Sequence, residues 1–202
     1  MDLNSPFDLT DQHSNTDHKI TVVLSRLSDL YRQLLWSKAQ PIGISPIQVQ
    51  LLLFIKHHSS DLNKVSHFSK EFQLTKATIS DSIRVLVEKQ LLEKVSEKAD
   101  RRSFYLKLTL KGESLASEAE GFTIRFQDVL NEIGQPKKDV LFESLYGLLN
   151  ELNQSGVIPV QRMCFGCNFY EGDKTNQHNC TFLKRKLNTS EIRIDCAEFK
   201  SA

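Results

Sequence analysis

Two short apolar segments joined by a charged stretch constrain the fold of this chain more than any other feature. Residues 92–96 have the apolar character of a strand, and in residues 104–110 apolar and polar side chains alternate with the period of a half-buried strand. The stretch between them, residues 97–103, is mostly charged. The pattern predicts a β-hairpin whose tip carries basic side chains.

Three helical segments precede this hairpin. Ser45 followed by Pro46 is typical of a helix start, and the helix that begins there extends to about residue 56. A short helix is expected at residues 64–72. Thr75 can cap a third helix, which carries its apolar residues on one face and leaves a polar face free. The order of three helices and a charged hairpin is that of a winged helix-turn-helix, in which the third helix enters the DNA major groove.

Amphipathic helices are also expected on both sides of the winged helix. Apolar residues recur at helical spacing between residues 20 and 35, and again in two helices that follow residue 112, the first of which ends at Gly134 and Pro136. These helices contain more apolar residues than the winged helix can cover, which predicts a two-fold homodimer. The alternative is a monomer in which the helices pack on their own domain.

We therefore expect a mainly α fold: a winged helix-turn-helix with a two-stranded wing, flanked by dimerisation helices, plus a small cysteine-rich C-terminal module. The expected boundaries are a flexible tail at 1–17, a domain at 18–153, a linker at 154–160 and the cysteine-rich, metal-binding module at 161–202. Within the domain, the winged helix occupies about 45–111 and the dimerisation helices about 18–39 and 112–153.

Positive charge is concentrated in one part of the chain. The formal net charge is only +1, yet residues 63–112 carry 11 basic and 6 acidic groups, whereas residues 113–160 carry 3 basic and 8 acidic groups. A local basic block is the electrostatic footprint of a surface that binds phosphates. Because this block coincides with the third helix and the hairpin, the charge pattern predicts DNA binding.

Residues 75–113 carry the most distinctive pattern of the winged helix. They read "TKATISDSIRVLVEKQ" and then "LLEKVSEKADRRSFYLKLTLKGE", and the most specific part runs from Asp100 and Arg102 through the alternating strand to Thr109 and Gly112. This pattern resembles the MarR family of bacterial transcriptional regulators, over roughly residues 17–153. The resemblance implies a dimer held by intertwined terminal helices. Together with two-fold symmetry, it predicts binding to double-stranded DNA with a roughly palindromic operator.

The candidate DNA-binding residues are short or forked hydrogen-bond donors. They are Lys76, Thr78, Ser80 and Arg84 on the third helix, and Lys98, Arg101 and Arg102 at the wing. The helix residues suit base edges and phosphates, and the two wing arginines suit a narrow minor groove. The alternative is that they are solvated charges on a winged helix that binds protein.

The resemblance also implies a binding pocket for a small aromatic effector between the winged helix and the dimerisation helices. In this chain, such a pocket would lie near Tyr31, Trp36 or His57. An apolar core explains these aromatic residues equally well.

All four cysteines lie after residue 163. They are Cys164, Cys167, Cys180 and Cys196, separated by two, twelve and fifteen residues. In a cytoplasmic protein such a set binds metal more readily than it forms disulfides. The C-terminal segment that contains them also has too little apolar core to fold without a bound metal.

Two cofactors fit these cysteines, with a slight preference for zinc. Four thiolates complete the tetrahedral shell of a structural Zn²⁺ ion, and His178 could replace one of them. However, an aromatic residue lies within three positions of every cysteine, which is similar to the pattern of high-potential iron–sulfur proteins, although the spacings differ. An iron–sulfur cluster, of the 4Fe–4S type, is therefore the alternative. A zinc ion would be structural, whereas a cluster would act as a sensor.

The sequence predicts a sequence-specific DNA-binding transcriptional regulator, most simply a dimeric repressor. Its DNA binding is expected to respond to a small ligand, or to a metal or redox signal at the cysteines. The alternative is an iron–sulfur redox protein that uses its winged helix for protein contacts.

Other classes of protein are not expected. The chain has no glycine loop that cradles phosphates, no nucleophile elbow and no histidine spacing of a metalloprotease, so that we do not expect an enzyme. It also has neither an apolar stretch of membrane-spanning length nor a secretory signal, which favours a cytoplasmic protein without membrane contacts.

Overall fold

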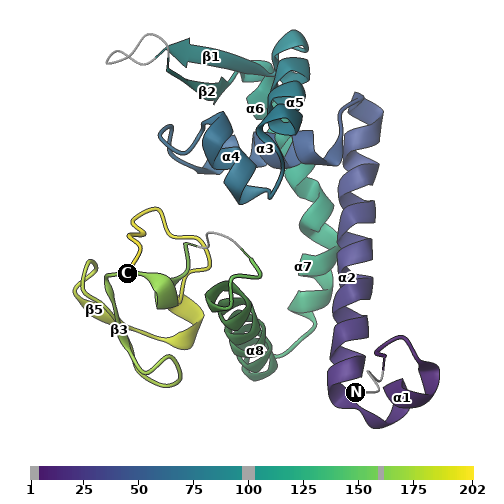
Figure 1. The fold of residues 1–202 in the computed structure, drawn as a ribbon, viewed down its shortest axis with the longest axis vertical. Coiled ribbons are helices and arrows are strands. Elements are labelled where there is room, and N and C mark those ends of the chain that lie inside the picture. Colours follow the sequence, from purple (N-terminus) through teal and green to yellow (C-terminus); the bar gives the residue numbers. More distant parts are fainter. Residues whose placement is uncertain (1–4, 97–102, 159–161) are drawn as a thin grey trace.

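The computed structural model describes residues 5–96, 103–158 and 162–202. Most of these residues are helical, and two small antiparallel sheets complete the fold (Figure 1). The helices are α1 (Leu9–Ser14), α2 (Thr16–Ala39), α3 (Pro46–His57), α4 (Val65–Glu71), α5 (Lys76–Glu88), α6 (Leu110–Ala119), α7 (Ile124–Asn131) and α8 (Gln135–Gln154). The strands are β1 (Leu92–Ser96), β2 (Phe104–Leu108), β3 (Tyr170–Gly172), β4 (His178–Cys180) and β5 (Arg185–Leu187).

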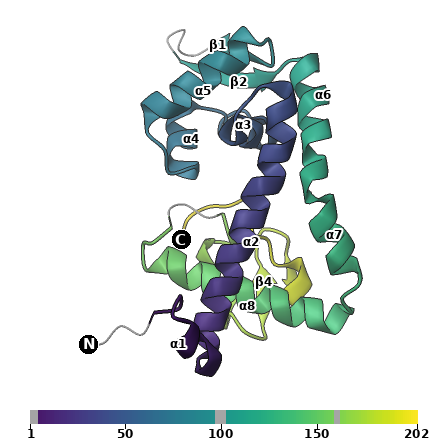
Figure 2. The same ribbon diagram turned by 90° about the vertical axis from the view of Figure 1, so that its right-hand side faces the viewer.

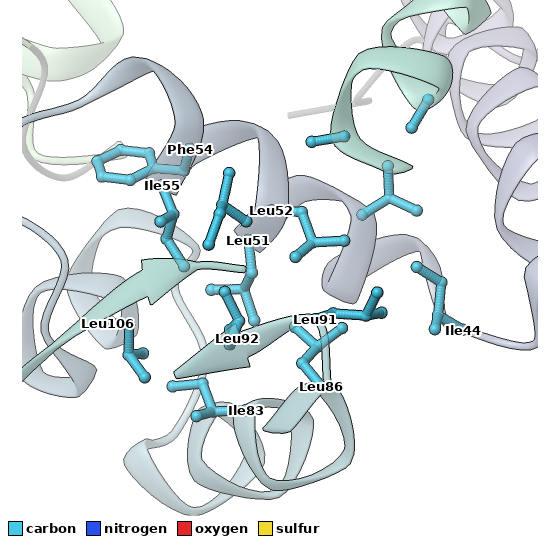
Figure 3. Close-up of a cluster of buried hydrophobic side chains, with 14 of the residues drawn as sticks. Ile44, Leu51, Leu52, Phe54, Ile55, Ile83, Leu86, Leu91, Leu92 and Leu106 are labelled. Atoms are coloured by element: carbon cyan, nitrogen blue, oxygen red, sulfur yellow. The ribbon is translucent and has the colours of Figure 1, made fainter. Parts of the chain in front are cut away.

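The winged helix consists of α3, α4 and α5 with the hairpin of β1 and β2, as the sequence predicted. The two strands pair antiparallel with Leu92 opposite Leu108. Apolar side chains from the helices and both strands converge on one core (Figure 3), in which Leu51, Phe68 and Leu106 are fully buried. Burial of this apolar surface is what holds the short elements together.

Side-chain caps fix where the elements of the winged helix begin. The Ser45 backbone N–H donates to Gln48 Oε1 over 2.8 Å, and the Thr78 backbone N–H donates to Thr75 Oγ1 over 3.1 Å. Both helix starts are therefore confirmed. The second strand ends at residue 108, not at 110 as expected, because Thr109 caps α6: its Oγ1 accepts from the Gly112 backbone N–H over 3.0 Å.

The helix expected after residue 112 differs from the prediction in two respects. The helix expected after residue 112 begins earlier, at Leu110, and is interrupted by a 3₁₀ turn at Glu120–Thr123 before α7 continues. Gly121 lies in this turn, and glycine is a weak helix former. The turn buries Phe122, whose ring packs edge-on against Tyr31 of α2 at 4.9 Å between centroids.

Part of the expected flexible tail is helical. The side chain of Asp8 accepts a hydrogen bond from the Thr10 backbone N–H over 2.8 Å and so caps α1. The side chain of Asn15 in turn caps α2, which therefore begins at residue 16. Figures 1 and 2 show α1 packed at the start of the long helix α2.

Residues 162–202 form a small module on the side of α8. Its strands β3, β4 and β5 make a three-stranded antiparallel sheet with Tyr170 opposite Cys180. Tyr146 of α8 packs against Phe165 at 4.7 Å between ring centroids, and Met163 and Ile192 are buried beside it. Figure 1 shows this module next to α8 and on the same side of the molecule as α4.

None of the helices in the described ranges is both long and apolar enough to cross a membrane.

The close approach at Gly112 generates a prediction about stability. A Cβ atom at this position would lie 2.0 Å from the Leu91 carbonyl oxygen. We expect Gly112→Ala to lower the free energy of unfolding by about 1–3 kcal/mol, because the backbone must shift to admit the methyl group. Urea unfolding measures the difference. The matched control is Gly147→Ala in α8, where a Cβ meets nothing within 4 Å and alanine favours the helix. Equal destabilisation by both changes would contradict this reasoning.

Candidate functional site

Helix α5 separates a buried face from a polar one. Ile79, Ile83 and Leu86 are buried in the core of the winged helix. The four helix residues that the sequence selected, Lys76, Thr78, Ser80 and Arg84, are all exposed. Arg84 has neighbours on its own helix, because its guanidinium lies 3.4 Å from Asp81 Oδ1 and 3.3 Å from Glu88 Oε1. Exposed ion pairs of this kind are weak, so that Arg84 can readily exchange these carboxylates for another anion.

The described part of the wing lies next to α5 (Figure 1). The three selected wing residues, Lys98, Arg101 and Arg102, lie outside the described residues. In the strands, Lys94 is exposed with its Nζ 4.9 Å from the centre of the Phe104 ring, and Lys107 is exposed opposite Glu93. The described strands therefore add two lysines to the polar surface beside α5.

The three residues expected near an effector pocket have different neighbours. Tyr31 packs between Phe122 and Phe126, and the side chain of Trp36 is about half exposed. Burial raises the pKa of the Tyr31 hydroxyl. His57 lies at the end of α3 and contacts Glu120 Oε1 through Nε2.

The four cysteines come together although they are far apart in the sequence. Cys164, Cys167, Cys180 and Cys196 line one pocket with a cavity volume of about 30 Å³, and all four are free thiols. The rest of the lining is mostly aromatic and aliphatic: Phe169, Tyr170, Phe182, Leu183 and Leu187, with Arg193 and Glu198. Burial raises the pKa of the Cys164 thiol, and the charges of the other three cysteines add to this effect.

Arg193 supplies hydrogen bonds to two of these sulfur atoms. Its backbone N–H donates to Cys164 Sγ over 3.3 Å, and its guanidinium donates to Cys196 Sγ over 3.5 Å. Among the described residues, no three His, Cys, Asp or Glu side chains converge closely enough to hold a single metal ion. His178 lies in a neighbouring pocket, where its Nδ1 is 2.8 Å from the Tyr170 hydroxyl and its ring stacks on Phe165. The structure therefore does not bring His178 into the cysteine pocket.

A buried arginine, which the sequence did not single out, joins the C-terminal module to the winged helix. Only 8% of the Arg162 side chain is exposed. Its Nη1 lies 3.0 Å from Glu71 Oε2 at the end of α4, and its Nε lies 2.5 Å from Asp195 Oδ1, one residue before Cys196. We call these contacts the Arg162 bridge. No local motif signals it, because Arg162 and Glu71 are 91 residues apart in the chain.

Two histidines border the Arg162 bridge. His58 Nε2 lies 2.6 Å from Asp195 Oδ2, and this hydrogen bond raises the pKa of His58. Burial alone would raise the pKa of Asp195, but the hydrogen bonds from His58 and Arg162 outweigh it and hold this pKa well below its usual range. His67 also lies beside Glu71, and burial lowers its pKa. The carboxylate of Asp195 therefore contacts both Arg162 and His58, and that of Glu71 contacts both Arg162 and His67.

Comparison with known proteins supports the resemblance suggested by the sequence. Residues 42–103 match the sequence model of the MarR family. A MarR/EmrR family transcriptional regulator from Acinetobacter sp. ADP1 superposes with a TM-score of 0.56 at 27% identity, over 69% of this chain and 99% of that chain. No curated protein sequence matches the chain.

Two structures of MepR from Staphylococcus aureus are also similar. The MepR–DNA complex has a TM-score of 0.57 at 21% identity and covers 65% of this chain and 97% of MepR. MepR in its DNA-binding conformation has a TM-score of 0.58 at 20% identity and covers 66% of this chain and 98% of MepR. The predicted fold, a winged helix with flanking helices, is thereby confirmed. About a third of the present chain has no counterpart in these structures.

The Arg162 bridge predicts a large difference between two arginine substitutions. Arg162→Met leaves the carboxylates of Glu71 and Asp195 without their cation, and we expect it to lower the free energy of unfolding by about 2 kcal/mol. Arg84→Met removes an arginine whose partners are all exposed, and we expect a change of about 0.5 kcal/mol or less. Urea unfolding of both variants checks this expectation. Similar losses in the two variants would show that the bridge does not stabilise the fold.

Proposed function

We propose that this protein is a DNA-binding transcriptional regulator that acts as a homodimer, most simply as a repressor. The observation that carries the proposal is the polar face of α5, which is exposed while the opposite face is buried in the core. A winged helix places such a helix in the major groove and its wing on the adjoining backbone or minor groove. The MarR family, whose model matches this segment, consists of transcription regulators and not of enzymes.

The charge of this region supports nucleic acid as the partner. Lys76 lies in the first turn of α5, where the helix dipole and the free backbone N–H groups also favour a phosphate. Thr78 and Ser80 follow on the exposed side, with hydroxyl groups that can donate to and accept from base edges. Phosphate contacts of Arg84 would replace its weak pairs with Asp81 and Glu88.

Two partly exposed apolar stripes support a homodimer. On α8, Leu141, Leu145, Leu148 and Leu152 are spaced by four, three and four residues, and each is between 36% and 43% exposed. On α2, Ile20, Val23, Leu27 and Leu30 have the complementary spacing of three, four and three, and are 43% to 53% exposed. Such spacing is that of helices that pack on other helices, and monomers rarely leave such surface in water. A second copy of the chain provides matching stripes in a two-fold arrangement, which places two α5 helices on a roughly palindromic operator.

The Arg162 bridge provides a physical route by which the cysteine module can regulate DNA binding. Asp195 lies next to Cys196 in the chain, while Glu71 ends α4, the helix immediately before α5. A change at the cysteines that displaces Asp195 alters the partner of Arg162 and hence of Glu71. The module would then shift the population of conformations that fit DNA. A small aromatic effector near Tyr31 and Phe122 is the alternative signal, because these rings lie where α2 meets the 3₁₀ turn after α6.

DNA binding is tested with a duplex that the wild-type protein selects from random sequence. We expect Lys76→Ala to weaken binding about tenfold at low salt and to reduce the slope of log affinity against log salt by about one, because one phosphate contact is lost. Arg102→Ala is expected to act in the same direction. The charge-matched control, Arg32→Ala on α2, removes an arginine that is 73% exposed outside the basic block and should bind as wild type. If the wild-type protein retained no DNA at moderate salt, the alternative function would be favoured: an iron–sulfur redox protein that uses its winged helix to bind protein.

Light scattering tests the dimer. We expect the wild-type protein to have twice the mass of one chain. The mass of the Leu145→Glu variant should fall towards that of a monomer, because the substitution places a charge in the apolar stripe of α8. Glu143→Lys changes an exposed side chain on the other side of the same helix and should leave the dimer intact. A monomeric wild-type protein would remove this part of the proposal.

A further inference from the structure

We propose that the four cysteines bind an iron–sulfur cluster of the four-iron type in the pocket that they line. This site is separate from the surface of α5, so that its occupancy does not depend on whether the protein binds DNA. Cysteine thiolates are the usual ligands of such clusters, and four of them complete a 4Fe–4S site. The spacing of the cysteines in the sequence left this cofactor and a zinc ion as alternatives.

The four thiols share one pocket. A single zinc ion needs its four sulfur atoms about 2.3 Å from one point. The described cysteines line this common pocket from three separate segments of the module. A four-iron cluster binds each thiolate at a different iron and therefore accepts sulfur atoms that are spread around a cavity.

The walls of the pocket also suit a cluster. Phe169 and Phe182 pack against each other at 5.4 Å between ring centroids, and Leu183 and Leu187 continue the apolar lining. An apolar shell limits the access of water and sets the local dielectric constant around a metal site.

Arg193 completes the site. It donates one hydrogen bond from its backbone to Cys164 Sγ and one from its guanidinium to Cys196 Sγ. Hydrogen bonds to ligand sulfur atoms and nearby positive charge stabilise the electron-rich cluster and raise its reduction potential. Arg193 is therefore a tuning residue for the cluster rather than a ligand.

The cluster would reach the winged helix through the Arg162 bridge, and this part of the inference rests on the proposed function. Cys196 follows Asp195 directly, so that ligation of Cys196 fixes the backbone that presents the Asp195 carboxylate to Arg162. Loss of the cluster frees that backbone. The proposed signal is therefore occupancy of the pocket by iron and sulfide.

Metal analysis of the full-length protein, purified without oxygen, tests the site. We expect about four iron atoms and four acid-labile sulfides per dimer subunit, with the visible absorption of an iron–sulfur cluster. Anaerobic incubation with ferrous iron and sulfide should restore this content in protein that has lost it. A colourless protein that holds one zinc per chain and takes up no iron and sulfide would overturn the proposal.

Two variants separate ligation from folding. Cys167→Ser should lose most of the iron, whereas Arg193→Met should keep the iron and lower the reduction potential of the cluster, because one hydrogen bond and one positive charge are lost. Full iron content in Cys167→Ser would contradict the assignment of ligands. Selected-duplex binding is then compared for the loaded and the iron-free wild-type protein. If the protein bound iron but neither the loaded nor the iron-free form bound DNA, the proposed cluster site would still be supported. Only the proposed function would be overturned.

Discussion

The buried guanidinium of Arg162 determines how the two parts of this molecule are joined. A buried charge is costly unless hydrogen-bonded anions surround it in good geometry. Here Glu71 comes from the winged helix and Asp195 from the C-terminal module, so that the cost is offset only when both parts are in their native positions. The ring of Phe54 on α3 adds a cation–π contact at 5.4 Å. The bridge therefore holds Asp195 of the module and Glu71 of the winged helix in a defined relative position, which an apolar contact alone would define less strictly.

Local patterns predicted the winged helix well, and contacts between distant segments could not be predicted. The hairpin and the helix starts at Ser45 and Thr75 follow from periodicity and capping, which act over a few residues. The 3₁₀ turn around Gly121 was missed because the apolar spacing continues through it. Arg162 was missed for a different reason: it looks like an ordinary surface charge until the fold places it between two carboxylates.

The cysteine site shows the same division. The sequence was enough to predict that the four cysteines act together, since four cysteines in a chain expected to be cytoplasmic favour a metal over disulfides. It could not distinguish zinc from a cluster, because the number of residues between cysteines does not determine the distances between their sulfur atoms. Those distances depend on how the whole module folds. In the structure, His178 lies beside Tyr170 in a neighbouring pocket and not in the pocket that the cysteines line.

Helix α8 connects the proposed dimer to the proposed sensor. Phe142, Tyr146 and Leu149 face the C-terminal module, while the apolar stripe that begins at Leu141 lies on another side of the helix and is exposed. One helix can therefore bind the module and a second subunit at the same time. In the proposed dimer, a change in the module would reach the winged helix of its own chain through Arg162, and the other subunit through α8. In a two-fold dimer, DNA binding depends on the distance between the two recognition helices. A signal that acted on both contacts would therefore alter the position of each α5 and also the distance between the two α5 helices.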